Sequence, residues 1–79
     1  MTQQDILGLI GRHAGEVLPR LQQHVFQPTD SLKDLGANSV DRSEIIMMTL
    51  ESLSVRIPLI EMAKARNIGE LAGIIHAKC

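Results

Sequence analysis

Aromatic side chains are almost missing from this 79-residue sequence: Phe26 is its only phenylalanine, and it has no tryptophan or tyrosine. Proteins that bind single-stranded nucleic acid stack the bases on aromatic rings and hold the phosphates with a basic excess. Here eight lysines and arginines stand against nine aspartates and glutamates. We therefore expect no nucleic-acid partner, and a core built from aliphatic residues and methionine.

Cysteine is equally scarce, because Cys79 is the only one and is the last residue. A single cysteine forms no internal disulfide and offers no thiol cluster to a metal, so we expect no metal site and a frayed terminal thiol. The sequence also lacks an apolar run near the roughly 20 residues of a membrane span, and its first residues lack the features of a signal peptide. We expect a cytoplasmic monomer with no membrane partner.

Groups that could perform catalysis are scattered. His13, His24 and His76 have no carboxylate or thiol at a catalytic spacing, and we interpret each as a surface or boundary residue. Glu44 and Glu51 are seven residues apart, which places them on one helix face as a solvated acidic patch. A domain of this size buries only about 60% of its unfolded surface, which leaves little room for an enclosed active site. We expect no enzymatic activity.

Apolar residues recur at spacings of three and four, the period of amphipathic helices, so the sequence predicts an all-α fold over residues 1–79. The first helix begins after Thr2, because Thr2 and Asp5 resemble a capping pair. It ends near Leu18, because Pro19 lacks the backbone N–H that the next turn needs. The whole pattern predicts one four-helix bundle domain with three main helices, a short third helix and a long first connection.

That first connection covers residues 19–38, which show no sustained period. Asp30 or Ser31 is suited by type to cap a single turn. Such a turn carries Leu32 and Leu35, and we expect these leucines to tie the loop to the bundle.

Three helices are expected after the loop. The second runs from Ser39 to Ser54, because a residue that precedes proline, here Ile57, is biased away from helical angles. The short third helix covers about residues 59–64, and Asn67 with Glu70 matches the capping pattern that opens the fourth. The expected inner-face residues are Ile45, Ile46, Leu50 and Leu53 of the second helix and Leu71, Ile74 and Ile75 of the fourth.

The run from Gly36 to Asp41, Gly-Ala-Asn-Ser-Val-Asp, is the one motif that suggests chemistry. Gly36 relieves crowding before the helix, Asn38 supports the turn, and Ser39 is an N-cap residue by type that presents its hydroxyl at the helix N-terminus. A helix N-terminus favours an anion through its free N–H groups and its dipole. The motif alone leaves two interpretations open: a plain helix cap, or the attachment point of a phosphate ester.

The position of this motif, after a long loop and at the head of the second of four helices, resembles the acyl carrier protein family, whose hallmark is a Gly-x-Asp-Ser-Leu-like run at that point. The resemblance extends to Leu32, Leu35, Asp41, Glu44 and Ile57-Pro58. It implies that a phosphopantetheinyl transferase, using coenzyme A and Mg²⁺, attaches 4′-phosphopantetheine covalently to Ser39. It also implies that the thiol of the arm holds an acyl group as a thioester.

Several residues depart from the usual family pattern. Asn38 replaces the aspartate, Val40 replaces the leucine, and the second helix has few acidic residues. Residues 36–46, with the Met-Met-Thr-Leu-Glu run that follows, are similar to the free-standing donor carriers of polyketide β-branching cassettes. That similarity implies a malonyl group, loaded by a malonyl/acyltransferase and decarboxylated to acetyl by a ketosynthase-like enzyme. An HMG-CoA synthase-like enzyme then accepts the acetyl group.

The partner surface is expected around Ser39. We expect Val40 to be exposed and Met48 to be more exposed than Met47, while Arg42 and Arg56 are more readily solvated than partner-binding. The residues assigned to this surface are Asn38, Val40, Asp41, Arg42, Glu44, Met48 and Arg56. Two alternatives remain open: a fatty-acid or peptidyl carrier protein, and a helical interaction module without an arm.

Overall fold

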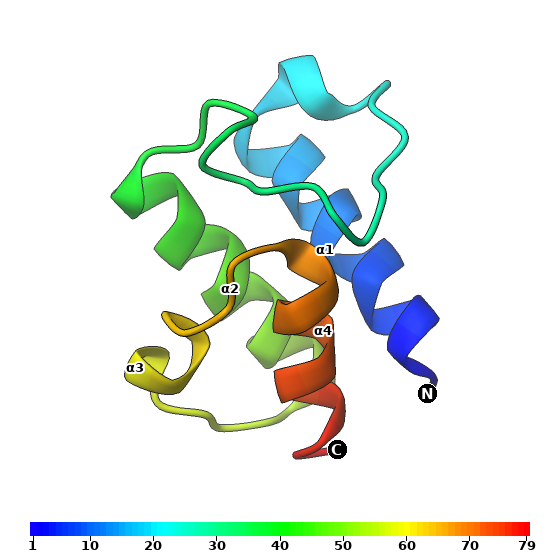
Figure 1. The fold of residues 1–79 in the computed structure, drawn as a ribbon, viewed down its shortest axis with the longest axis vertical. Coiled ribbons are helices and arrows are strands. Elements are labelled where there is room, and N and C mark those ends of the chain that lie inside the picture. The colour runs from blue at the N-terminus through cyan, green and yellow to red at the C-terminus, as the bar shows by residue number, and fades with distance from the viewer.

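The computed structural model describes residues 1–79, and all of its regular structure is helical. Its elements are α1 (Gln3–Val17), a 3₁₀ turn η1 (Pro19–Leu21), α2 (Ser39–Leu53), α3 (Leu59–Met62) and α4 (Ile68–His76) (Figure 1). This confirms the expected fold of three main helices, a short third helix and a long first connection. None of these helices has both the length and the apolar character that crossing a membrane requires.

The start of α1 is the expected capping pair. Thr2 Oγ1 accepts the N–H of Asp5 at 3.1 Å, and Asp5 Oδ2 accepts the N–H of Thr2 at 2.9 Å. The hydrogen bonds from Thr2 hold the pKa of the Asp5 carboxyl below its ordinary value. The helix ends at Val17, two residues before Pro19, which confirms the predicted end to within one residue.

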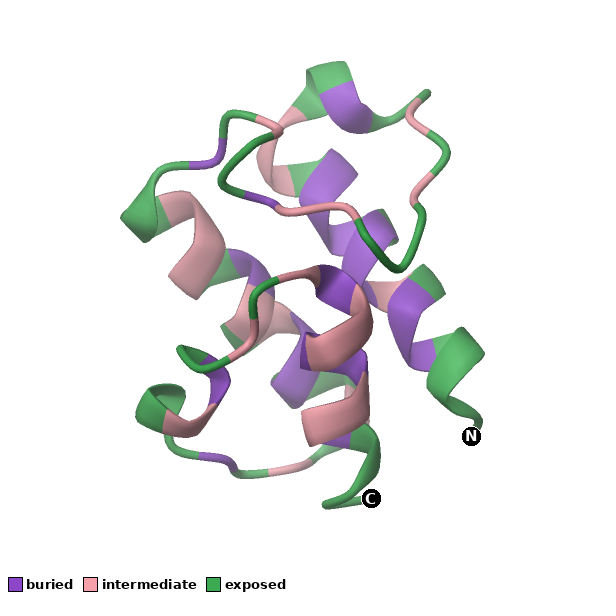
Figure 2. Ribbon diagram, viewed as in Figure 1, coloured by how far each residue is buried: buried purple, intermediate pink, exposed green.

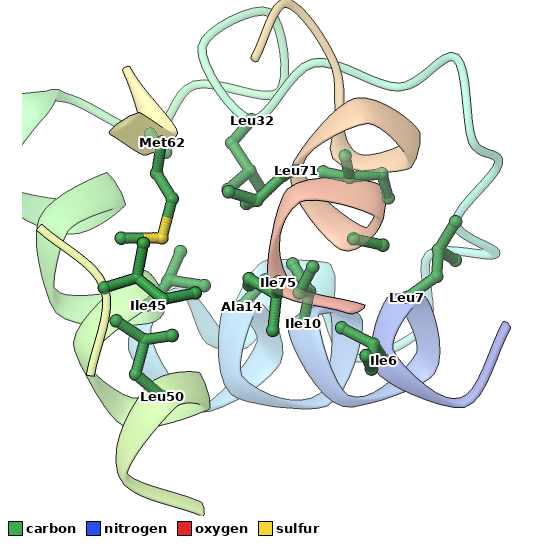
Figure 3. Close-up of a cluster of buried hydrophobic side chains, with 14 of the residues drawn as sticks. Ile6, Leu7, Ile10, Ala14, Leu32, Ile45, Leu50, Met62, Leu71 and Ile75 are labelled. Carbon is green, nitrogen blue, oxygen red and sulfur yellow. The ribbon is translucent and has the colours of Figure 1, made fainter. Parts of the chain in front are cut away.

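Helix α1 is the centre of the molecule, because both α2 and α4 pack against it. Helix α2 runs back along α1, and the two chain ends lie at the same end of the molecule (Figure 1). The buried faces of the three helices meet in one aliphatic cluster, which Figure 3 shows in close-up. Its fully enclosed isoleucines are Ile6, Ile10, Ile45, Ile68 and Ile75.

The loop between α1 and α2 is tied down at two places. Its Leu32 is buried in the core, on a turn in which the carbonyl of Ser31 accepts the N–H of Leu35 at 3.0 Å. Asp30 does not cap this turn; its carbonyl accepts the N–H of Ile68 at 2.8 Å, which ties the loop to the start of α4. The loop is therefore anchored to the core and to the last helix.

The interpretation of His13 as a surface or boundary residue is wrong. Its side chain lies in the contact between α1 and α2 and is only 7% exposed. Its Nε2 is 2.9 Å from the Ser52 hydroxyl, so a partner on α2 makes burial of the imidazole tolerable. His24 is half-buried and His76 is exposed, as expected.

Two helix ends differ in detail from the expectation. Helix α3 ends at Met62 instead of Lys64. At the start of α4, Asn67 Oδ1 accepts the N–H of Glu70 at 2.8 Å as predicted, but the Glu70 carboxylate accepts the N–H of Arg66 and not that of Asn67. This hydrogen bond from Arg66 is the main reason that the pKa of Glu70 is lowered.

Candidate functional site

The helix cap at the start of α2 is made by Asn38, not by Ser39. Asn38 Oδ1 accepts the N–H of Asp41 at 2.8 Å, and Asp41 Oδ2 accepts the N–H of Asn38 at 3.1 Å. Ser39 is therefore the first helical residue, which confirms the predicted start of the second helix, while the interpretation of Ser39 as a plain helix cap is wrong. The error has a physical reason: both residues suit the cap by type, and the reciprocal pair forms only between residues three positions apart, which selects Asn38 with Asp41.

Because Asn38 takes the capping role, the Ser39 side chain is left free. Ser39 is exposed, and its hydroxyl makes no hydrogen bond within the protein. The backbone N–H groups of Ser39 and Val40 also have no partner, whereas those of Asn38 and Asp41 are satisfied by the cap. A free hydroxyl beside two unpaired N–H groups at a helix N-terminus suits a phosphate ester. Figure 2 shows this end of α2 as an exposed corner of the molecule.

The backbone just before Ser39 is held from two sides. Arg20 Nη2 donates to the carbonyl of Leu35 at 2.8 Å, and Arg42 Nη1 donates to the carbonyl of Ala37 at 2.7 Å. Between them Gly36 has a φ of +95°, which L side chains rarely adopt. Arg42 is thus bonded to the loop and half-buried, and the expectation that it is freely solvated is wrong.

A cavity of about 500 Å³ lies beside Ser39 and is lined by residues of the long loop, α2, α3, the connection after α3 and α4. Ser39, Arg42 and Ser43 contribute its polar wall, while Ile46, Leu59 and Met62 are part of its apolar wall. A flexible group attached at Ser39 therefore has a partly apolar space beside it. The lining thus offers polar groups near Ser39 and apolar surface further along the cavity.

Helix α2 turns a continuous face to solvent. Val40, Glu44, Met47 and Glu51 recur at spacings of four, three and four, and all four are exposed. The exposure predicted for Val40 is confirmed, at 71%.

The expected order of exposure of the two methionines is wrong, because Met47 is 58% exposed while Met48 is half-buried. Counting helical positions from Val40 places Met47 on the exposed face, so the signal is present in the sequence.

The remaining predicted surface residues are placed as follows. Asn38 and Glu44 are exposed, Asp41 is half-buried through its part in the cap, and Arg56 is exposed. Arg56 lines a second groove of about 510 Å³ with Met47, Leu50 and Leu59, at the far end of α2. Sequence reasoning missed Arg20, because no local pattern connects it with a loop 15 residues later. No group of three or more His, Cys, Asp or Glu side chains is placed to hold a metal ion.

Comparisons with known proteins identify the family of this chain. The family described as "Phosphopantetheine attachment site" matches residues 8–75. A polyketide biosynthesis acyl carrier protein, AcpK of Bacillus subtilis (strain 168), is 50% identical over 78 residues, which are 99% of this chain and 95% of that protein.

A solved structure also matches. It is the HMG synthase of the curacin biosynthetic pathway in complex with an acetyl donor acyl carrier protein, and its matching chain has a TM-score of 0.93 and 50% identity. The match covers 99% of this chain and 100% of that one. The chain therefore belongs to the phosphopantetheine attachment-site family, and it is an acyl carrier protein.

Proposed function

We propose that Ser39 is the residue that carries the 4′-phosphopantetheine arm. The observation that carries this proposal is the exposed Ser39 hydroxyl, which is free of any cap hydrogen bond at the N-terminus of α2. Ser39 also lies inside the stretch that matches the family. The arm, when attached, supplies a thiol that holds an acyl group as a thioester.

The residues of the chain have separate tasks in this proposal. Asn38 and Asp41 hold the start of α2, so that the Ser39 hydroxyl is presented to a transferase without being used as a cap. The unpaired N–H groups of Ser39 and Val40 favour the negative charge of the ester. Ile46 and Met62, in the apolar wall of the cavity, provide a surface against which the arm can pack.

Intact-mass spectrometry tests the attachment. The chain is incubated with coenzyme A, Mg²⁺ and a broad-specificity phosphopantetheinyl transferase, and its mass should rise by one phosphopantetheine. Ser39→Ala should abolish the rise. Ser43→Ala is the matched control, because Ser43 lies one turn further along α2 and lines the same cavity; it should be modified normally. Modification of the Ser39→Ala variant would show that another residue carries the arm.

We further propose that the cargo is a malonyl group that becomes an acetyl group, and that the acceptor is an HMG-CoA synthase-like enzyme of polyketide β-branching. Support comes from the solved complex of an HMG synthase with an acetyl donor carrier. The matching chain of that complex is 50% identical to this chain. A malonyl/acyltransferase and a decarboxylating ketosynthase-like enzyme complete this set of cytoplasmic partners. Loading the carrier in their presence should give malonyl and then acetyl species by mass.

The exposed face of α2, formed by Val40, Glu44, Met47 and Glu51, is the surface that we propose for these partners, together with Asn38, Asp41 and Arg56. Two of the four residues on the face are apolar and two acidic, so shape and apolar burial contribute more here than charge. Met48 is a weaker candidate than Met47, because it is half-buried. Met47→Asp should weaken binding to the HMG-CoA synthase-like enzyme.

Val25→Asp is the matched control for this surface, because Val25 is an exposed apolar residue on the long loop. Equal weakening by the two substitutions would argue against the α2 face.

A fatty-acid or peptidyl carrier remains the alternative cargo assignment. Loading rates with malonyl, long-chain acyl and aminoacyl donors separate the polyketide, fatty-acid and peptidyl assignments. Preferential aminoacyl loading would contradict the polyketide assignment.

A further inference from the structure

The three residues that lead into the site, Leu35 to Ala37, are held by two arginine side chains, Arg20 from the η1 turn and Arg42 from the start of α2. Their three N–H groups all donate to backbone carbonyls three to five residues earlier: Leu35 to Ser31 at 3.0 Å, Gly36 to Lys33 at 3.0 Å and Ala37 to Leu32 at 2.9 Å. The carbonyls of Leu35 and Ala37 take no part in these backbone hydrogen bonds, and each accepts a guanidinium N–H instead. Two guanidinium groups therefore donate hydrogen bonds to carbonyls within three consecutive residues.

Arg20 reaches this segment from the η1 turn. Its Nη2 lies so close to Gly36 that a Cβ added to that glycine would overlap it. The glycine thus serves two purposes, since it adopts the φ of +95° and it leaves room for the guanidinium. The hydrogen bond to Leu35 joins η1 to the loop that precedes α2.

Arg42 reaches the same segment from the first turn of α2. It donates to the carbonyl of Ala37, a residue only 2% exposed, at 2.7 Å. Arg42 lies one turn after Ser39 and lines the same cavity. Neither Arg20 nor Arg42 forms an ion pair, whereas Arg12 pairs with Glu16 at 3.6 Å. Both arginines therefore have a backbone carbonyl as their hydrogen-bond partner.

We propose that Arg20 and Arg42 are positioning residues that clamp the Leu35–Ala37 backbone, so that the Ser39 hydroxyl is held in the geometry that the phosphopantetheinyl transferase needs. The clamp rests on the proposed attachment at Ser39. In that transfer Ser39 Oγ forms a new P–O bond, the pyrophosphate bond of coenzyme A breaks, and adenosine 3′,5′-bisphosphate leaves. The hydroxyl proton goes to a base of the transferase. The arginines touch none of these atoms in the proposal; they restrict where Oγ lies.

The test compares Arg20→Met, Arg42→Met and the double variant with the unmodified wild-type chain. Methionine keeps an apolar stem and removes the guanidinium donors, so packing is disturbed little. Arg20→Lys and Arg42→Lys each restore one donor and should recover part of the effect. Arg12→Met is the matched control, because Arg12 is an exposed arginine that contacts only a side chain of its own helix.

Two measurements are made on each variant. The first is hydrogen exchange of the Ala37 amide in the chain before modification, because its bond to Leu32 reports directly on the clamped segment. The second is the steady-state rate of arm transfer as a function of carrier concentration. We expect the kcat of arm transfer to fall about fivefold in each Met variant and about tenfold or more in the double variant. The Ala37 amide should exchange faster by a similar factor. KM for the carrier should stay within about twofold, since the exposed face of α2 is unchanged.

Several results would overturn the clamp. If the Ala37 amide exchanged at the same rate in the double variant as in the wild type, the clamp would be refuted. This result does not depend on whether the wild-type chain accepts an arm. A rise in KM with unchanged kcat and exchange would assign the arginines to direct contact with the transferase. An equal fall in kcat in the Arg12→Met variant would show that the loss of any positive charge, and not the clamp, lowers the rate of arm transfer. Failure of the proposed attachment is a separate observation, namely no mass gain in the wild-type chain.

Discussion

Gly36→Ala is the substitution that tests most directly how the backbone before α2 is built. Alanine at a φ of +95° costs about 1–3 kcal/mol in backbone strain. The new methyl group also displaces Arg20, whose exposed hydrogen bond to Leu35 contributes about 0.5–1.5 kcal/mol. Against this, alanine lowers the entropy of the unfolded chain, which returns about 0.4–1 kcal/mol. We expect a net destabilisation of about 2 kcal/mol, the centre of a range of roughly 0.5–4 kcal/mol.

Urea and thermal unfolding, followed by circular dichroism, measure this change. In a domain of this size about 2 kcal/mol corresponds to a fall in Tm of roughly 8–16 °C. Gly8→Ala is the matched control, because Gly8 lies in α1 and an added Cβ would meet no atom within 4 Å, so this substitution should stabilise the protein by about 0.5–1 kcal/mol. A Gly36→Ala variant as stable as the wild type would refute the argument that this position is strained.

Four further substitutions and one pH series test other parts of the structure. Asn38→Ala should cost about 1 kcal/mol in the free energy of unfolding and Ser39→Ala less than about 0.5, because only Asn38 caps α2; a larger cost for Ser39→Ala would contradict this cap. Ile10→Ala should cost about 2–5 kcal/mol in the same denaturation assay, while Ile60→Ala, at an exposed site, should stay within about 0.5. The N–H of Gln27, and then His24, lower the pKa of Asp30, so this carboxylate stabilises the fold above its unfolded pKa of about 3.8 and the contribution is lost as the pH falls through the lower folded value. Urea titrations between pH 5 and pH 2 should therefore show a shallower acid loss in Asp30→Asn, and an unchanged slope would argue against this role.

Helix positions could be predicted from the sequence because each helix carries its own local signals. The Thr2–Asp5 pair, Pro19, Pro58 and Asn67 act within a few residues, and the observed ends lie within about two residues of the expected ones. The family and Ser39 as the candidate site followed from a short motif and its place in the chain. These features depend on neighbours in the sequence.

The cap at Asn38 and the exposure of Met47 had local signals that were misread, whereas the misplaced His13 and the missed Arg20 concern contacts between segments that are distant in the sequence. His13 is buried because Ser52, 39 residues later, meets it across the α1–α2 contact. Arg20 contacts a loop 15 residues away. Neither of these two pairings has a local signal, so neither could be predicted from spacing alone.

The cap formed by Asn38 and Asp41 has a consequence for the life cycle of the carrier. A serine that closed its own helix would have to give up that hydrogen bond, or share it, each time the hydroxyl became an ester. Here the helix start is secured by its two neighbours, Asn38 and Asp41. With the arm on Ser39, as proposed, the apo and loaded forms keep the same start of α2, so partner enzymes distinguish the two forms by the attached arm and not by a change in the helix.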